Sequence, residues 1–295
     1  MNLRFLLFFL LSAPLISGAA GAEAIPVCTG LAPVAHIAAA VGGKRITVST
    51  MLPPGRSPHD YAPGTRELRL AMRSKLFLTT NMLYEQRITR ALKNRVPVVN
   101  VSDKIRRIPL SSGKHDHHHC GLDHHSCGGD AEAGDPHVWL SPVNCALMAE
   151  RIADELSRIA PAYKAEFRER AAAFGMKMRK IHENTLKLLA PFKGRSFFVY
   201  HPAFGYFARL YGLEQHAIEL GGREATPARM ASVIREARKA GVKVVFVQKQ
   251  FNPASAKALA NAIKGEVVEL DPLAADVGKN FSDLCGALLK GFGKK

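Results

Sequence analysis

Three histidines share one local setting, beside a proline in a loop or at the end of an expected strand. They are His59 in SPHDY, His137 in DPHVW and His201 in VYHPA. Asp271, in VVELDPL, follows another expected strand. Zn²⁺ accepts imidazole nitrogen and carboxylate oxygen at about 2.0–2.2 Å, so these four side chains would make a tetrahedral shell. Each histidine taken alone is more commonly a hydrogen-bonded structural residue, and only the shared placement favours a metal site.

A second group of histidines lies in residues 111–134, which are rich in Gly, Asp and His and have no apolar periodicity. This composition predicts a mobile surface loop that contacts Zn²⁺, Cu²⁺ or Ni²⁺ with modest affinity. A polar linker or an expression tag is the alternative, and Cys120 and Cys127 could instead form a disulfide. The histidines predicted as accessory ligands are His115, His117, His118, His119, His124 and His125.

The rest of the chain alternates short apolar runs with amphipathic stretches, which predicts βαβ units and mainly parallel sheets. We expect strands at 46–48, 76–78, 97–101, 196–200, 215–219, 242–247 and 267–270. We expect helices at 33–41, 65–71, 85–92, 142–159, 161–189, 204–211, 227–240, 253–263 and 281–289.

This pattern predicts an α/β protein of two lobes joined by one long helix. Residues 25–160 would form the N-terminal lobe, including the loop 111–134, and 191–295 the C-terminal lobe. The linking helix, 161–190, would extend about 40 Å at 1.5 Å per residue. Ligands bind outside the carboxyl ends of strands in open α/β sheets, so the four candidate ligands are expected to meet between the lobes.

Residues 1–24 have the pattern of a cleaved secretory signal. Arg4 precedes an apolar run at 5–16, and small residues follow, with cleavage expected after Ala22 or Ala24. A membrane anchor is the alternative, but the run is short for a span, which needs about 20 residues. Cys28 is a poor lipidation site because the bulky Val27 precedes it. Export to an oxidising compartment permits disulfides, and five cysteines leave at least one unpaired in a monomer.

The formal net charge is +16, which raises the question of a nucleic acid or anionic membrane partner. The Lys and Arg residues are spread along the chain, and no stripe of aromatic and basic residues stands out. We therefore interpret the charge as a solvated basic surface and expect no nucleic acid partner.

Taken together and in order, the motifs resemble those of the periplasmic zinc-binding proteins of ABC importers, the ZnuA-like members of the cluster A-I solute-binding proteins. The similarity covers most of the chain after the signal. It rests on SPHDY at 57–61, the histidine-rich loop, DPHVWLSP at 135–142, HPAFGYF at 201–207, YGL at 211–213 and LDPL at 270–273.

The resemblance implies a periplasmic protein that binds Zn²⁺ between its lobes and passes it to a membrane permease of an ABC importer. By position, His59, His137 and His201 would be the ligands, and Asp271 or water the fourth. Manganese-type relatives carry Glu where His201 stands, so the histidine favours zinc over Mn²⁺. Two departures are notable. Only Cys285 lies in the second lobe, where zinc members often have a disulfide, and residues 64–66 read GTR where relatives more often have a proline-serine turn.

Other functions remain open from the residues themselves. A binding protein for another divalent metal such as Mn²⁺ is one, and a metal buffer or adhesin without a transporter is another. A zinc hydrolase would need an open coordination position and a general base. No His-Glu-x-x-His pattern is present, and Asp271 as a fourth ligand would close that position. We therefore expect no enzyme activity, and a monomer is the default expectation.

Overall fold

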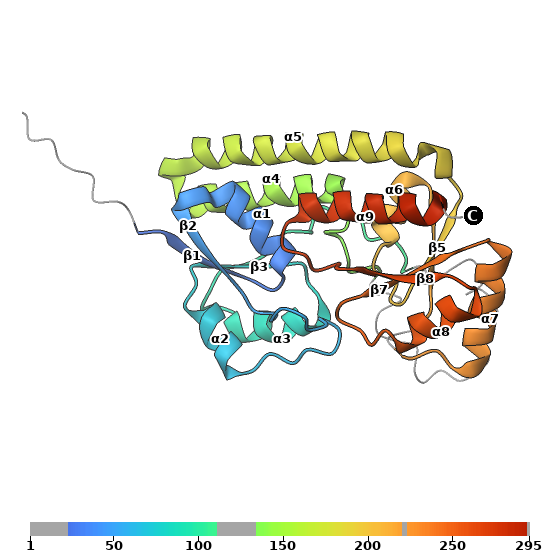
Figure 1. Cartoon of the computed structure of the whole chain (residues 1–295). Helices are drawn as coiled ribbons and strands as arrows, with labels where there is room; N and C mark the ends of the chain where they lie inside the picture. Colours follow the sequence, from blue (N-terminus) through green and yellow to red (C-terminus); the bar gives the residue numbers. More distant parts are fainter. Residues whose placement is uncertain (1–22, 111–133, 220–222, 294–295) are drawn as a thin grey trace, which may run out of the picture.

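The computed structural model of the protein describes residues 23–110, 134–219 and 223–293. Nearly all of the expected signal, and the six histidines of the 111–134 segment, lie outside these residues. Within them the chain folds as two parallel sheets with helices packed around them, as the alternating pattern predicts (Figure 1).

The first sheet has the strand order β2-β1-β3-β4, with every pair parallel. Its strands are β1 Ile25–Thr29, β2 Ile46–Thr50, β3 Leu76–Thr79 and β4 Val98–Asn100. The helices of this lobe are α1 Ala32–Gly42, α2 Thr65–Met72 and α3 Leu83–Leu92. Gly64, which departs from the usual motif, is the N-cap residue of α2. Its N–H donates to the Glu67 carboxylate at 2.9 Å, as in a capping box.

The second sheet repeats this topology in the order β6-β5-β7-β8, again with parallel pairs. Its strands are β5 Ser196–Val199, β6 Glu214–Ala217, β7 Val244–Gln248 and β8 Glu266–Leu270. The helices are α6 Gly205–Tyr211, α7 Pro227–Lys239 and α8 Ala254–Ala262. Because both sheets are parallel, each lobe presents its strand carboxyl ends along one edge.

Three long helices lie on the same side of the molecule, with one of them extending over both lobes (Figure 1). They are α4 Pro142–Ile159, α5 Lys164–Leu189 and α9 Val277–Gly293. Pro161 does divide α4 from α5, but it begins a short 3₁₀ turn, and the regular helix starts at Lys164. The 26 residues of α5 extend about 39 Å and cross from one lobe to the other.

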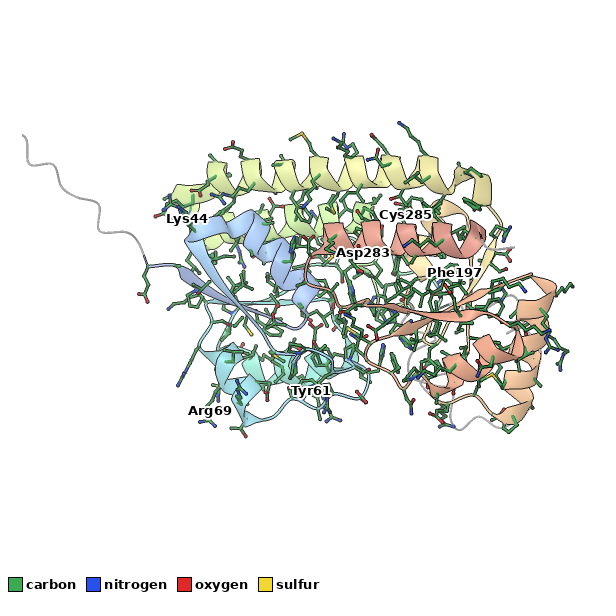
Figure 2. All side chains as sticks on the ribbon, viewed as in Figure 1. Lys44, Tyr61, Arg69, Phe197, Asp283 and Cys285 are labelled. Atoms are coloured by element: carbon green, nitrogen blue, oxygen red, sulfur yellow. The ribbon has the colours of Figure 1, made fainter. Side chains whose placement is uncertain are left out.

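The main hydrophobic core is continuous between the lobes. It contains Ile37 of α1, Phe174 of α5 and Phe281 of α9, all buried. Cys285 of α9, labelled in Figure 2, belongs to the same core. Its thiol forms a hydrogen bond with Thr185 of α5. A second, smaller core lies in the C-terminal lobe and includes Val245 of β7. The long helices therefore share one core with both sheets rather than only tethering two separate units.

Two elements differ from the sequence prediction in ways that matter below. Strand β1 was not predicted, and it buries Cys28 completely beside Ser49 of β2. Strand β6 ends at Ala217, so Glu219 lies beyond it rather than within it.

Cys28, Cys145 and Cys285 are free and buried, whereas Cys120 and Cys127 fall outside the described residues. Among the described helices, none has both the length and the apolar character required to cross a bilayer.

Candidate metal centre

His59 comes from the N-terminal lobe, in the loop between β2 and α2. Its backbone N–H donates to Ser57 Oγ at 3.2 Å, which holds the turn around Pro58. The residue is solvent-exposed, unlike the other two histidines of the centre. His59 is thus presented from a surface loop.

His137 precedes α4, in a turn that Asp135 stabilises. Asp135 Oδ1 accepts a hydrogen bond from the His137 backbone N–H at 2.9 Å and lies 2.8 Å from His137 Nδ1. Tyr206 of the C-terminal lobe donates its hydroxyl to the Asp135 carbonyl at 3.0 Å. The His137 ring lies edge-on to Trp139, with the ring centres 5.6 Å apart. Both Asp135 and His137 are buried, so the imidazole has a fixed orientation.

His201 follows β5 in the C-terminal lobe and is held at every polar group but one. Gln248 accepts from its backbone N–H at 3.1 Å and donates to its carbonyl at 2.6 Å. Glu219 Oε1 lies 2.6 Å from His201 Nδ1. The ring also stacks on Phe251 at 5.1 Å. The remaining polar atom, Nε2, faces His137.

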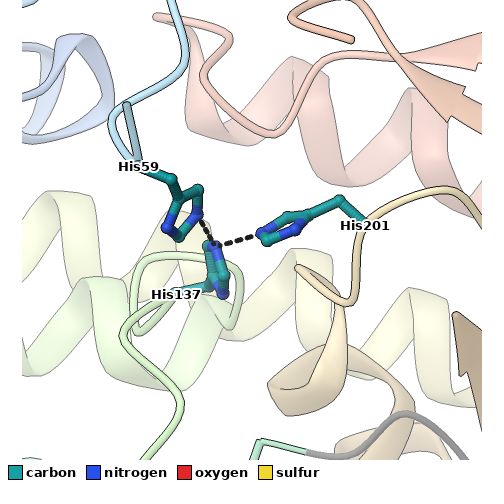
Figure 3. A group of neighbouring side chains, drawn as sticks. All are labelled: His59, His137 and His201. Carbon is teal, nitrogen blue, oxygen red and sulfur yellow. Dashed lines mark hydrogen bonds between the residues drawn. The ribbon is translucent and has the colours of Figure 1, made fainter. Parts of the chain in front are cut away.

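The three Nε2 atoms converge on one point between the lobes (Figure 3). His137 Nε2 lies 3.2 Å from His59 Nε2 and 3.1 Å from His201 Nε2, and one donor atom of each residue lies within 4.8 Å of the others. Nitrogens around a tetrahedral Zn²⁺ at 2.0–2.1 Å are separated by about 3.3 Å. The two distances from His137 Nε2 therefore match neighbouring sites of such a shell.

The carboxylates behind the rings decide which nitrogens carry lone pairs. When Asp135 and Glu219 accept the Nδ1–H of His137 and His201, both Nε2 atoms are left as acceptors. Two lone pairs 3.1 Å apart repel one another, and a cation placed beside them attracts both. Among the described residues, this is the group of metal-binding side chains that the structure brings together.

Burial lowers the pKa of His137 well below its usual value, and the nearby His201 and Arg107 lower it further. Desolvation of the ring among its neighbours lowers the pKa of His59 too, helped by His201 and His137. Both imidazoles are therefore neutral at pH 7, the form that binds a metal. Burial raises the pKa of the Asp135 carboxyl to about 7.

Asp271 does not lie within the group of three imidazoles in the described structure. It follows β8, as the sequence indicates, but its Oδ1 accepts hydrogen bonds from Gln250 Nε2 at 2.8 Å and from the Leu273 N–H at 3.0 Å. Its role as a fourth ligand stays a prediction. So does the accessory role of the histidines at 115–125, which lie outside the described residues.

Sequence reasoning did not identify the groups that support the ligands, namely Asp135, Glu219 and Gln248. Asp135 stands two residues before His137, and that short spacing is a signal that could have been used. Glu219 and Gln248 lie 18 and 47 positions after His201, and only the folded sheet brings them to it.

Comparison with known proteins gives a consistent result. Residues 27–290 match the sequence model of the family described as "ZnuA: Zinc-uptake complex component A periplasmic". The zinc-binding protein AdcA of Streptococcus pyogenes serotype M3 is 28% identical over 261 residues, covering 84% of this chain and 50% of the relative. The chain thus spans about half the length of the AdcA relatives that it matches. The high-affinity zinc uptake system protein ZnuA of Yersinia pestis is 25% identical, covering 91% of this chain and 89% of the relative.

Solved structures resemble the fold over nearly its whole length. A crystal structure of ZnuA superposes with a TM-score of 0.80 at 26% identity, covering 91% of this chain and 99% of that one. A ZnuA deletion mutant lacking residues 138–173, with zinc bound, gives a TM-score of 0.82 at 25% identity, covering 92% and 100%.

Proposed function

This chain belongs to the family of periplasmic A components of zinc-uptake complexes, and from that membership we propose that it captures Zn²⁺ and delivers it to the membrane permease of an ABC importer. The ion is cargo in this proposal and not a cofactor, so the protein is a binding protein without catalytic activity. It acts in the periplasm after removal of the signal, as a monomer.

The convergence of the three Nε2 atoms is the observation that carries the proposal. Three neutral imidazoles suit Zn²⁺, a borderline-soft ion, better than Mn²⁺, which prefers oxygen donors. The relatives named as a zinc-binding protein and as a zinc uptake system protein support the same choice. Asp271 or a water molecule completes the shell, and the histidines at 115–125 serve as weaker accessory ligands.

The position of the centre supports a role in transport. His59 and His137 come from the N-terminal lobe and His201 from the C-terminal lobe, so binding ties the lobes together. Because the lobes share a core through α5 and α9, a large hinge opening would expose buried apolar surface. Release is therefore expected to proceed through local movement of a ligand loop, and exposed His59 is the ligand best placed to move first.

Zinc affinity measured by competition with a chromophoric chelator tests the proposal, using protein without residues 111–134. The parent should bind one ion tightly. His59→Ala, His137→Ala and His201→Ala should each weaken binding by more than about 100-fold, because loss of a ligand costs more than the 10- to 100-fold typical of outer-shell groups. His216→Ala, a histidine of β6 outside the centre, is the matched control and should bind normally.

The same assay separates the two candidates for the fourth ligand. Asp271→Asn should weaken zinc binding, but less than removal of His201, because water can occupy a vacant tetrahedral position. Unchanged affinity would assign that position to water. Wild-type affinity in His59→Ala and His201→Ala would refute the centre itself.

A further inference from the structure

Glu219 has a special position among the acidic side chains of the C-terminal lobe. It lies two residues past the end of β6, and its backbone N–H donates to the Tyr200 carbonyl at 3.0 Å. It is only 2% exposed. The side chain thus starts from a fixed point beside the His201 backbone and ends 2.6 Å from His201 Nδ1.

Burying a carboxylate is costly unless it is paired or hydrogen-bonded to a group that needs it. Gln248 already holds the backbone of His201 from both sides, so the peptide does not require Glu219 for its hydrogen bonds. What Glu219 adds is contact with the imidazole and a negative charge. Both are directed at the ring whose other nitrogen faces the metal centre.

The contact between Glu219 and His201 also affects the charge balance of the metal site. Three neutral imidazoles around a divalent ion leave two positive charges in a site where His137 and His201 are buried. The carboxylates that contact these rings directly are Asp135 and Glu219, one behind each buried ligand. Negative charge on these carboxylates offsets the charge of the ion without adding an oxygen ligand to the three imidazoles.

We propose that Glu219 is a positioning and specificity-determining residue for zinc. It fixes the Nδ1–H tautomer of His201, aims Nε2 at the ion and supplies charge that favours a divalent cation bound through nitrogen. By compensating the charge from behind the rings, it keeps the inner shell rich in nitrogen and so disfavours Mn²⁺. This inference rests on the proposed zinc-binding function and adds to it a residue outside the ligand set.

The test compares three variants in the protein without residues 111–134. Glu219→Gln keeps an oxygen that can accept the Nδ1–H but removes the charge, and Glu219→Ala removes both. Glu224→Gln, an exposed glutamate five positions later, is the control for the same chemical change. Zinc affinity by chelator competition, the visible spectrum of bound Co²⁺ and the melting temperature of the metal-free protein are measured for each.

We expect Glu219→Gln to lower zinc affinity by about 10- to 100-fold and Glu219→Ala by more, with a changed Co²⁺ spectrum for Glu219→Ala. The ratio of Zn²⁺ affinity to Mn²⁺ affinity should fall in both Glu219 variants. Glu224→Gln should match the parent in all three measurements. A purely structural role would lower the melting temperature of the metal-free protein without changing the Co²⁺ spectrum or the Zn²⁺/Mn²⁺ preference, and that result would overturn the inference.

A double-mutant cycle checks that Glu219 acts through His201. In a His201→Ala background, Glu219→Gln should cause little further loss of affinity, because the ring that it supports is gone. An equal loss in both backgrounds would refute the proposal even where a variant is less stable. Failure of the parent to bind zinc would instead refute the proposed function, so the two failures are distinguishable.

Discussion

Glu85 is a buried carboxylate that organises the start of α3. Its Oε2 accepts hydrogen bonds from the hydroxyl of Thr79 at 2.7 Å, from the N–H and hydroxyl of Thr80 at 3.0 and 3.2 Å, and from the N–H of Met82 at 2.9 Å. Its Oε1 has no partner among the described side chains and backbone. Burial raises the pKa of this carboxyl, and the four donors only partly oppose that rise.

This raised pKa predicts how stability depends on pH. An acid whose pKa is higher in the folded state binds its proton more tightly there, so its contribution to stability falls as pH rises from the unfolded value through the folded one. Glu85→Gln cannot ionise. As the pH rises from about 5 to about 8, the free energy of unfolding of Glu85→Gln should therefore increase relative to that of the parent.

Denaturant unfolding of both proteins at the two pH values measures that difference. Glu150→Gln, an exposed glutamate on α4, serves as a control and should show little change between the two conditions. A shift in the opposite direction would mean that the donors to Oε2 outweigh burial.

At the same scale, the sequence predicted the three imidazoles but not the groups behind them. His59, His137 and His201 could be recognised because each has an unusual local neighbourhood, a proline beside a histidine near a strand end. Glu219 has no such neighbourhood, and the sequence placed it inside a strand. Its contact with His201 depends on the register of β5 against β6, which the local sequence does not specify.

Among the secondary-structure elements, β1 and α3 approach one another closely at Gly30. A methyl group at this position would come within 1.7 Å of Glu85 Oε1 and 2.8 Å of the Tyr84 hydroxyl oxygen. Neither side chain can move easily, because both are buried. Gly30→Ala should therefore destabilise the fold by about 1–3 kcal/mol, the usual cost of overpacking.

Gly286→Ala provides the matched control for that substitution. Gly286 lies within α9, and nothing lies within 4 Å of the methyl group that it would gain. Alanine favours a helix interior over glycine by about 0.5–1 kcal/mol, so this variant should be slightly more stable than the parent. Thermal unfolding compares the two, and a Gly30→Ala variant as stable as Gly286→Ala would contradict the described packing.

Most elements could be predicted because hydrophobic runs and turn residues mark them locally. The runs at 46–48, 76–78 and 242–247 lie in strands of the structure, with ends that differ by a few residues. Strand β1 was missed because it directly follows the expected signal, although Gly30 marks its end before α1. Its membership of the sheet depends on pairing with both β2 and β3.

For the whole molecule, the shared core predicts a single cooperative unfolding transition. Phe281 of α9 is 1% exposed and belongs to the core that includes Ile37 and Phe174. Phe281→Ala should cost about 3–5 kcal/mol and lower the unfolding midpoint of both lobes together. Calorimetry and circular dichroism should give one coincident transition before and after the change.

Leu188→Ala is the control for that variant, because Leu188 lies on α5 but is 52% exposed. Its effect should be small. Two separate transitions, with only one moved by Phe281→Ala, would show that the lobes unfold independently. The sequence predicted the long helix but not this coupling, since contacts between α1, α5 and α9 join residues far apart in the chain.

Trp139 is the chain's single tryptophan, and its position gives the protein an intrinsic optical signal. Its indole N–H donates to the Pro272 carbonyl across the lobe boundary at 2.7 Å, and its ring lies against the ring of His137. Indole emission responds to nearby charge and to the loss of such a hydrogen bond. Native fluorescence should therefore report both the arrival of an ion at His137 and any separation of the two lobes, without an added dye.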